Sequence, residues 1–143
     1  MNKEDKKSVA MNFRKELETF TTNVNELHKN GGLSTKQEFL EKIAEDVNRL
    51  YATSIQAQKA EDEEIEEIGS IIQNIFVQPI AIKHHKHVTI LKAVETFEPG
   101  KGDDCDLSFI MREYVNHPAS TKSFLIELEL LTDDLNDALR HIA

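Results

Sequence analysis

The strongest constraint on the fold is a regular stripe of apolar residues near the start of the chain. Its members are separated by three and four positions in strict alternation, which is the spacing of one face of an α-helix. The stripe consists of Ala10, Phe13, Leu17, Phe20, Val24 and Leu27. Gly31 and Gly32 follow it, and glycine commonly ends a helix at its C-terminal side. The sequence therefore predicts a long first helix that ends before these glycines.

A second helix is predicted directly after the glycines. Ser34 with Gln37, or Thr35 with Glu38, has the spacing of a capping box, in which two side chains satisfy free amides of the first helical turn. The apolar stripe that follows consists of Phe39, Ile43, Val47 and Leu50, with Tyr51 and Ile55 beside it. Because the connection is short, we expect the first two helices to form an antiparallel hairpin.

The stretch from residue 61 to 79 has a further helical stripe, which is out of phase with the second one. The stripe consists of Ile65, Ile68, Ile72 and Ile75. Either the second helix continues with a shift in its periodicity, or a new helix begins near Asp62. We favour a new helix, because it places an acidic cluster in the first turn, where the helix dipole stabilises negative charge. Pro79 ends this segment.

Two later segments have patterns that fit both helix and strand. Residues 86–97 have apolar positions at helical spacing, but they also contain β-branched residues, which favour a strand. Residues 123–131 alternate in polarity like a strand that would lead into a helix capped at Thr132. We favour a helix there, because Leu and Glu are helix formers and the apolar stripe continues to residue 142. Between these segments, residues 104–114 are predicted to form a helix with Phe109, Ile110 and Tyr114 facing inward.

Composition supports one helical domain. The chain has 143 residues, of which 39% are hydrophobic and 30% charged, and this length can enclose a core without disulfides or metal ions. Only 5 glycines and 3 prolines interrupt it, which favours long helices. We predict an all-α fold, namely a single-domain bundle of four to six helices over residues 1–143, with room for minor β content around 86–97.

Charge and cysteine content narrow the function. The formal net charge is −9, which argues against general binding to duplex nucleic acid, since such binding relies on Lys and Arg contacts with phosphates. The one cysteine, Cys105, cannot form an intramolecular disulfide, and no secretory signal or membrane-spanning stretch is evident. We expect a cytoplasmic protein that has no membrane role and binds another protein. We expect no cofactor, because the sequence has no glycine-rich phosphate loop and no Cys-x-x-Cys pair.

An acidic run, EDEEIEE, is the first candidate binding surface. It consists of Glu61, Asp62, Glu63, Glu64, Glu66 and Glu67. It lacks the alternating oxygen ligands and the turn glycine of a calcium loop. One interpretation is a solvated helix start. The other is an acidic surface that binds a basic partner or imitates a phosphate backbone.

A basic run, KHHKH at residues 83–87, contains three histidines. His84 and His87 would share a face of a helix, and His85 and His87 would share a face of a strand. Two ligands do not make a metal site, and the two lysines repel a cation, so we predict no metal site. We favour a solvated basic face or a partner for the acidic run.

Arg112 and His117 stand five positions apart in the stretch REYVNHP, which also contains Pro118. In this one motif, R-x4-H, the chain resembles the HEPN superfamily of helical ribonucleases. The resemblance implies a small helical bundle that commonly dimerises. It would make Arg112 the phosphate-binding cation and His117 the general acid and base, while a 2′-hydroxyl attacks the adjacent phosphate. The alternative is a helix boundary, because the residue before a proline leaves helical geometry and Pro118 then begins the next helix.

The sequence leaves two functional hypotheses. We expect a non-enzymatic protein that binds another macromolecule, as a regulator, an inhibitor or an assembly subunit. A HEPN-like, metal-independent ribonuclease that uses Arg112 and His117 is the alternative.

The first helix also suggests a homodimer. Its stripe from Phe13 to Leu27 is narrow, which is more typical of an interface between two helices than of a helix that covers a broad core. We expect this stripe to contribute to a two-fold interface. The alternative is that the second helix of the same chain covers it.

Overall fold

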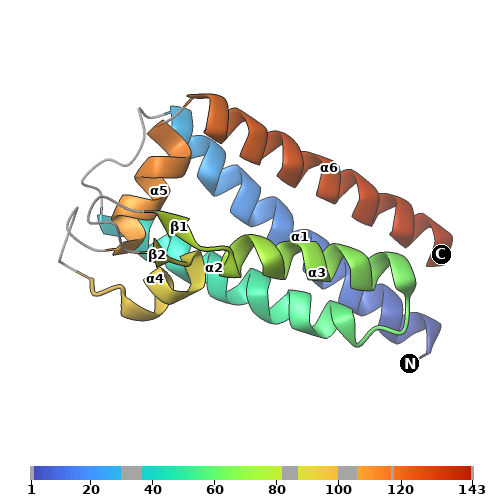
Figure 1. The fold of residues 1–143 in the computed structure, drawn as a ribbon. Helices are drawn as coiled ribbons and strands as arrows, with labels where there is room; N and C mark the ends of the chain where they lie inside the picture. The colour runs from blue at the N-terminus through green and yellow to red at the C-terminus, as the bar shows by residue number, and fades with distance from the viewer. Residues whose placement is uncertain (1, 30–36, 82–86, 100–105, 117, 143) are drawn as a thin grey trace.

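The computed structural model describes residues 2–29, 37–81, 87–99, 106–116 and 118–142. Within these ranges the chain forms six helices and one short pair of strands (Figure 1). The helices are α1 (Lys3–Lys29), α2 (Gln37–Gln58), α3 (Glu63–Val77), α4 (Ile90–Thr96), α5 (Asp106–Asn116) and α6 (Pro118–Ile142). The strands β1 (Ile80–Ala81) and β2 (His87–Val88) pair antiparallel. The predicted all-α bundle is therefore confirmed.

The four long helices form the body of the molecule. Helix α1 packs between α2 and α6, and α3 packs against α2 on one side and α6 on the other. The shorter α4 and α5, with the strand pair, cover one end of these helices (Figure 1). Both chain termini lie at the opposite end. No helix within the described ranges is both long enough and apolar enough to cross a bilayer.

The apolar stripe of the first helix lies inside the chain. Its fully buried members are Ala10, Phe13, Leu17, Phe20 and Val24. Helix α2 packs along one side of α1 and helix α6 along another, so two helices of the same chain share this narrow stripe. The expectation that it contributes to a two-fold interface is therefore wrong. The antiparallel hairpin of α1 and α2 is present. The glycines and the candidate caps Ser34 and Thr35 lie outside the described residues, while Gln37 and Glu38 belong to the first turn of α2.

Aromatic packing joins three of the long helices. Phe20 of α1 lies with its ring centroid 5.6 Å from that of Phe76 in α3 and 6.3 Å from that of Phe124 in α6. Both pairs are edge-to-face, the arrangement that the ring quadrupoles favour. Phe20 thus links α1 to both α3 and α6.

The break predicted near Asp62 is present. The Asp62 carboxylate accepts a hydrogen bond of 3.1 Å from the amide of Ile65 and caps α3. Glu61, just before it, has a φ of 55°, a left-handed conformation that turns the chain between α2 and α3. The two helices then approach so closely that a Cβ on Gly69 would lie 2.9 Å from the carbonyl oxygen of Ser54.

The two ambiguous segments have different outcomes. Residues 86–97 contain both predicted structures, because β2 ends at Val88 and α4 begins at Ile90, with Thr89 as its N-cap. Residues 123–131 are helical, as favoured, and belong to α6. In α5, Ile110 is buried and Phe109 partly so, while the side chain of Tyr114 is outside those described.

Candidate functional site

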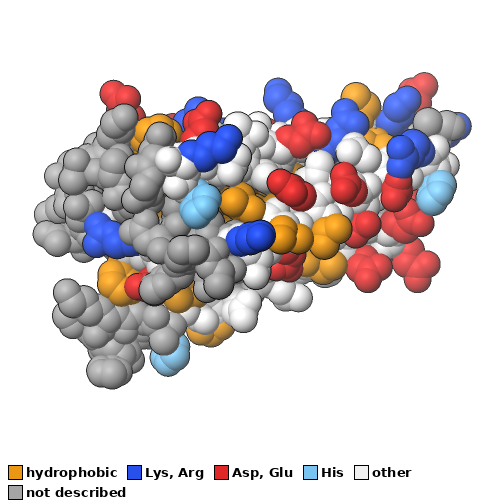
Figure 2. Space-filling model, turned by 90° about the horizontal axis from the view of Figure 1, so that it is seen from above, with side chains coloured by type: hydrophobic (Ala, Val, Ile, Leu, Met, Phe, Trp, Pro, Cys, Tyr) orange, Lys and Arg blue, Asp and Glu red, His pale blue; other side chains and the backbone are white. Residues whose placement is uncertain are grey.

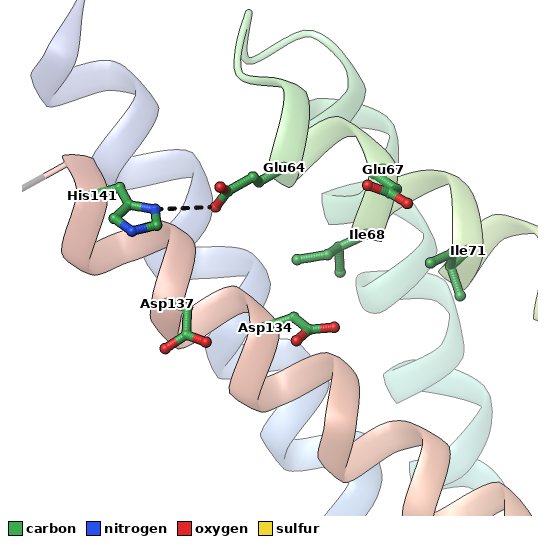
Figure 3. Close-up of a pocket in the computed structure, with 7 residues that line it drawn as sticks. All are labelled: Glu64, Glu67, Ile68, Ile71, Asp134, Asp137 and His141. Atoms are coloured by element: carbon green, nitrogen blue, oxygen red, sulfur yellow. Dashed lines mark hydrogen bonds and ion pairs between the residues drawn. The ribbon is translucent and has the colours of Figure 1, made fainter.

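A groove between α3 and α6 is the best candidate for a functional site. It has a volume of about 320 Å³. Its lining residues, which we call the acidic groove, are Glu64, Glu67, Ile68, Ile71, Asp134, Asp137 and His141 (Figure 3). Four of these seven residues are carboxylates, and none is Lys or Arg.

Helical spacing explains how the groove is built. Glu64, Glu67 and Ile71 lie three and four positions apart, so they share the face of α3 that is turned towards α6. Asp134, Asp137 and His141 have the same spacing on α6. The two helices approach each other over a much shorter stretch than the other neighbouring long helices. The surface above the buried Ile68 is therefore left open between two rows of polar side chains.

The charges in the acidic groove are only partly compensated. Glu64 lies 3.4 Å from the Nδ1 atom of His141, and the two side chains are 54% and 71% exposed. Asp137 forms an ion pair with Arg140 of its own helix. Glu67 and Asp134 form no ion pair with any other residue that the structure describes. The acidic groove thus carries an excess of negative charge.

The structure separates the six acidic residues predicted as a binding surface. Only Glu64 and Glu67 line the acidic groove. Asp62 caps α3, Glu61 forms the turn before it, and neither lines the groove. The remaining two, Glu63 and Glu66, are on α3 but outside the groove.

The contribution of α6 was missed in the sequence. Asp134, Asp137 and His141 complete the groove, although His141 is 77 positions from Glu64. Asp137 and His141 are four positions apart, a spacing that would allow their side chains to contact each other on one helix. Instead, each of these side chains interacts elsewhere, Asp137 with Arg140 and His141 with Glu64.

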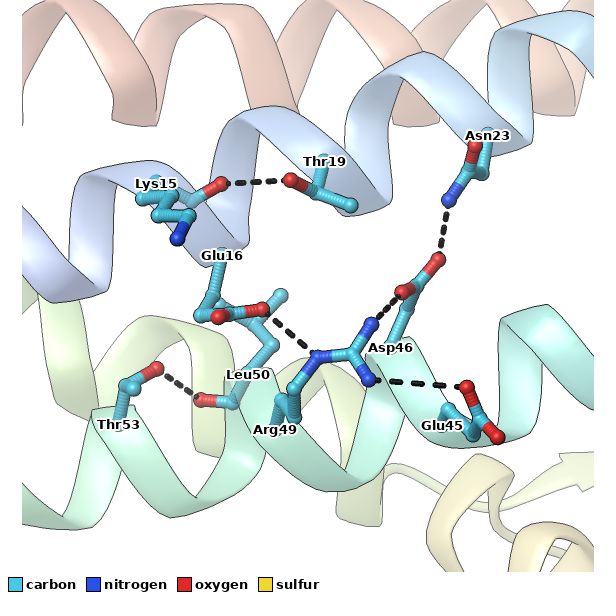
Figure 4. Close-up of polar contacts among 9 residues, drawn as sticks. All are labelled: Lys15, Glu16, Thr19, Asn23, Glu45, Asp46, Arg49, Leu50 and Thr53. Atoms are coloured by element: carbon cyan, nitrogen blue, oxygen red, sulfur yellow. Dashed lines mark hydrogen bonds and ion pairs between the residues drawn. The ribbon is translucent and has the colours of Figure 1, made fainter.

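A second polar cluster lies between α1 and α2 and has the opposite character (Figure 4). The carboxylate of Asp46 is fully buried and accepts hydrogen bonds from the Nδ2 atom of Asn23 and from Arg49. Arg49 also donates from Nε to Glu16 at 3.1 Å and lies 3.7 Å from Glu45. Each carboxylate of the cluster therefore has a positive neighbour.

Burial determines the titration of this cluster. Removal from water raises the pKa of the Asp46 carboxyl above its usual value, although the hydrogen bond from Asn23 and the charge of Arg49 lower it. Both oxygens of the carboxylate are already bonded to neighbours, and the side chain has no access to solvent. The cluster therefore fixes α1 against α2 and is not a ligand site.

A groove of opposite charge lies between α1 and α6. It has a volume of about 400 Å³. Its lining residues, which we call the basic groove, are Lys7, Met11, Arg14, Asn136, Leu139 and Arg140. A third groove, of about 420 Å³, lies farther along the same two helices. It is lined by Glu18, Thr21, Thr22, Glu129, Thr132 and Asp133.

The structure does not test the predicted ribonuclease motif. Arg112 is half-buried on α5, and His117 lies outside the described residues. The boundary itself is as predicted, because α5 ends at Asn116 and α6 begins at Pro118. The test remains RNA cleavage that is lost when Arg112 and His117 are replaced.

The histidine-rich run can be followed only in part. His84 and His85 lie outside the described residues, while His87 is exposed in β2. Among the side chains that the structure describes, no three of His, Cys, Asp and Glu are grouped so that they could hold a metal ion.

Comparison with known proteins adds no relationship. No protein-family model, curated protein or solved structure matches this chain.

Proposed function

We propose that this protein is a non-enzymatic binding protein whose acidic groove holds a positively charged segment of a protein partner. The observation that carries the proposal is the lining of the groove. Two helices contribute four carboxylates around the isoleucines of α3, and no Lys or Arg lines the groove to neutralise them.

The chemistry of the groove favours a particular kind of segment. Ile68 is 4% exposed and Ile71 is partly buried, so the bottom of the groove offers apolar contact below the charges. An amphipathic helix with Lys or Arg on both sides of an apolar row complements this arrangement. A purely charged segment would leave the isoleucines uncovered.

The electrostatic contribution to affinity is moderate. Exposed ion pairs each contribute roughly 0.2–1 kcal/mol, and salt screens them. Glu67 and Asp134 gain most from a cationic partner, because neither has an ion pair among the described residues. We therefore expect binding that is fast, dependent on ionic strength and sensitive to these two positions.

The test uses a synthetic amphipathic helix that carries Lys on both sides of a Leu row. Its binding to the wild type is measured by fluorescence anisotropy at low and high salt. The variant carrying Glu67→Lys and Asp134→Lys is expected to lose binding. Glu41→Lys is the control, because this exposed residue lies on α2 outside the groove. Equal binding by the double variant and the control would contradict the proposal.

A further inference from the structure

We propose that the acidic groove is occupied by a second copy of this chain, which binds through its basic groove. The inference rests on the proposed function, since it takes the acidic groove as the interaction surface and names its occupant. The result is a two-fold dimer in which each acidic groove meets the basic groove of the other copy.

The basic groove has the chemistry that the acidic groove requires. Lys7, Met11 and Arg14 share one face of α1, since they are four and three positions apart. The apolar Met11, which is 45% exposed, thus stands between two cations. Together with Arg140 of α6, these two cations give the basic groove the charge that complements the carboxylates of the acidic groove.

The cations of α1 are available for such a contact. The chain has 26 acidic and 17 basic residues, yet Lys7 and Arg14 form no ion pair within the part of the chain that the structure describes. Arg14 instead donates from Nη1 to the neutral Oδ1 atom of Asn136 at 3.2 Å, which orients the guanidinium and leaves its other donors for a ligand.

The two grooves are placed for reciprocal contact. Both have α6 as one wall, with α3 completing the acidic groove and α1 the basic one. Figure 2, which looks down on α6, shows Asp and Glu gathered along one edge of the terminal end and Lys and Arg along the opposite edge. Opposite charges therefore stand on the two sides of one helix, at the same level.

Symmetry selects one arrangement of the copies. A two-fold axis parallel to α6 places the acidic edge of each copy against the basic edge of the other, so the dimer has two such contacts. An axis perpendicular to α6, in the plane of contact, would place acidic edge against acidic edge. Charge complementarity therefore favours parallel α6 helices over antiparallel ones.

The outer face of α6 lies nearest the axis in this arrangement. Ile126, which is 45% exposed, stands opposite the buried stripe of α6 and would meet its own copy. Leu130, one turn further, is 58% exposed and would also lose solvent contact. Asp133 lies close to the same line and repels its copy, so we expect a weak dimer that dissociates on dilution.

The experiment exchanges charges between the two grooves. One variant carries Glu67→Lys and Asp134→Lys, and the other carries Lys7→Glu and Arg14→Glu. Sedimentation velocity over a concentration series is expected to show a dimer for the wild type and a monomer for each variant alone. An equimolar mixture of the two variants is expected to restore the dimer, because each acidic edge again meets a basic one.

Other outcomes overturn the inference. A wild type that stays monomeric up to high micromolar concentration excludes the dimer, and variants that still dimerise alone place the interface elsewhere. If circular dichroism shows that a charge variant is unfolded, disulfide cross-linking is used as the test instead, with Ile126→Cys in a Cys105→Ser background. Parallel α6 helices predict rapid disulfide formation between copies at this position, and a lack of cross-linking in a folded protein contradicts them.

The outcomes also separate this inference from the proposed function. If the wild type is monomeric and binds the basic helical peptide, the acidic groove remains a site for a partner protein, and a second copy is excluded as its occupant. The opposite result is a protein that does not bind the peptide at any concentration but whose two variants form a dimer when mixed. This result supports a second copy as the occupant of the acidic groove and excludes an external partner.

Discussion

Two interfaces of the same bundle treat their charges in opposite ways. Between α1 and α2, Asp46 and Glu16 each contact Arg49, Asn23 donates to Asp46, and the helices lie close together along their length. Between α3 and α6, Glu67 and Asp134 have no ion pair among the described residues, and the helices approach only over a short stretch.

The difference shows what each interface is suited for. A closed interface with paired charges specifies which helices pack and in what register, but it leaves nothing for an external partner. The open interface has one polar contact across it, between Glu64 and His141, and both side chains are exposed. Apolar contacts below must therefore contribute most to holding these helices in place. Glu67 and Asp134 have no ion pair among the described residues, and this difference is the reason for proposing a binding site between α3 and α6.

The largest effect is expected from Phe20→Ala. The ring of Phe20 packs against Phe76 in α3 and Phe124 in α6, so its removal leaves a cavity where α1, α3 and α6 meet. Such truncations cost about 3–5 kcal/mol of unfolding free energy. Urea denaturation measures this value, with Val77→Ala, at a residue that is 44% exposed, as the control. A cost as small as that of the control would mean that apolar contacts do not hold the open interface together.

A smaller loss is expected from Asp46→Ala. The substitution leaves the buried amide of Asn23 without its acceptor, which costs about 1–3 kcal/mol. Arg49 is 47% exposed and can turn to water, so its charge adds little to the loss. The matched control is Glu45→Ala, since Glu45 contacts the same Arg49 from a side chain that is 71% exposed. Equal costs for the two variants would remove the distinction between the buried and the exposed carboxylate.

The pH dependence of Asp46 sharpens the comparison further. Because burial raises its pKa, the folded protein binds this proton more readily than the unfolded chain does. Through this group, stability is gained as the pH falls from neutrality towards about 3.9, the value in an unfolded chain, and is lost as the pH rises through the folded pKa.

Asp46→Asn isolates this contribution, because the amide does not titrate. The unfolding free energy of the wild type, relative to this variant, is expected to rise as the pH is lowered from 7 to 4. Urea titrations of both proteins at several pH values measure the difference. A difference that falls with acidification would show that the Arg49 charge, rather than burial, controls the carboxyl.

The smallest effect is expected from neutralising the open interface. Replacing Glu67 with Gln and Asp134 with Asn removes two negative charges from one groove without removing an ion pair, so stability should rise slightly, by less than about 0.5 kcal/mol. The gain should be largest at low ionic strength and vanish in concentrated salt, because the repulsion is exposed and screened. Thermal melts in both buffers measure it. A loss of stability at low salt would mean that these carboxylates have stabilising contacts.

The sequence predicted where helices form better than it predicted which helices pack against each other. Three-and-four spacing identifies the apolar face of a helix, which is why α1, the break at Asp62 and the helical character of residues 123–131 were predicted. The same spacing does not say which helix covers that face. The stripe of α1 therefore suggested a second copy, whereas α6, more than 90 positions later, covers it together with α2.

For the same reason, the sequence predicted only one of the two walls of the candidate site. Glu64 and Glu67 belong to a dense acidic run that is visible in the sequence. Asp134 and His141 belong to an ordinary mixed segment, and only the packing of α6 beside α3 gives them a role. A site assembled from distant helices has no local pattern, so the sequence could show one wall and not the groove.

The packing of the last helix against the first has a consequence for folding. Arg14 and Asn136 are hydrogen-bonded across 122 positions, so this contact closes a long loop, whereas α1, α2 and α3 meet through short connections. Loop closure of this length is entropically costly, so we expect α6 to dock last and to limit the folding rate. Because α6 is a wall of both charged grooves, neither groove exists before that step. If the proposed function is correct, a nascent or partly folded chain cannot bind the partner, because the groove that holds the partner has not yet formed.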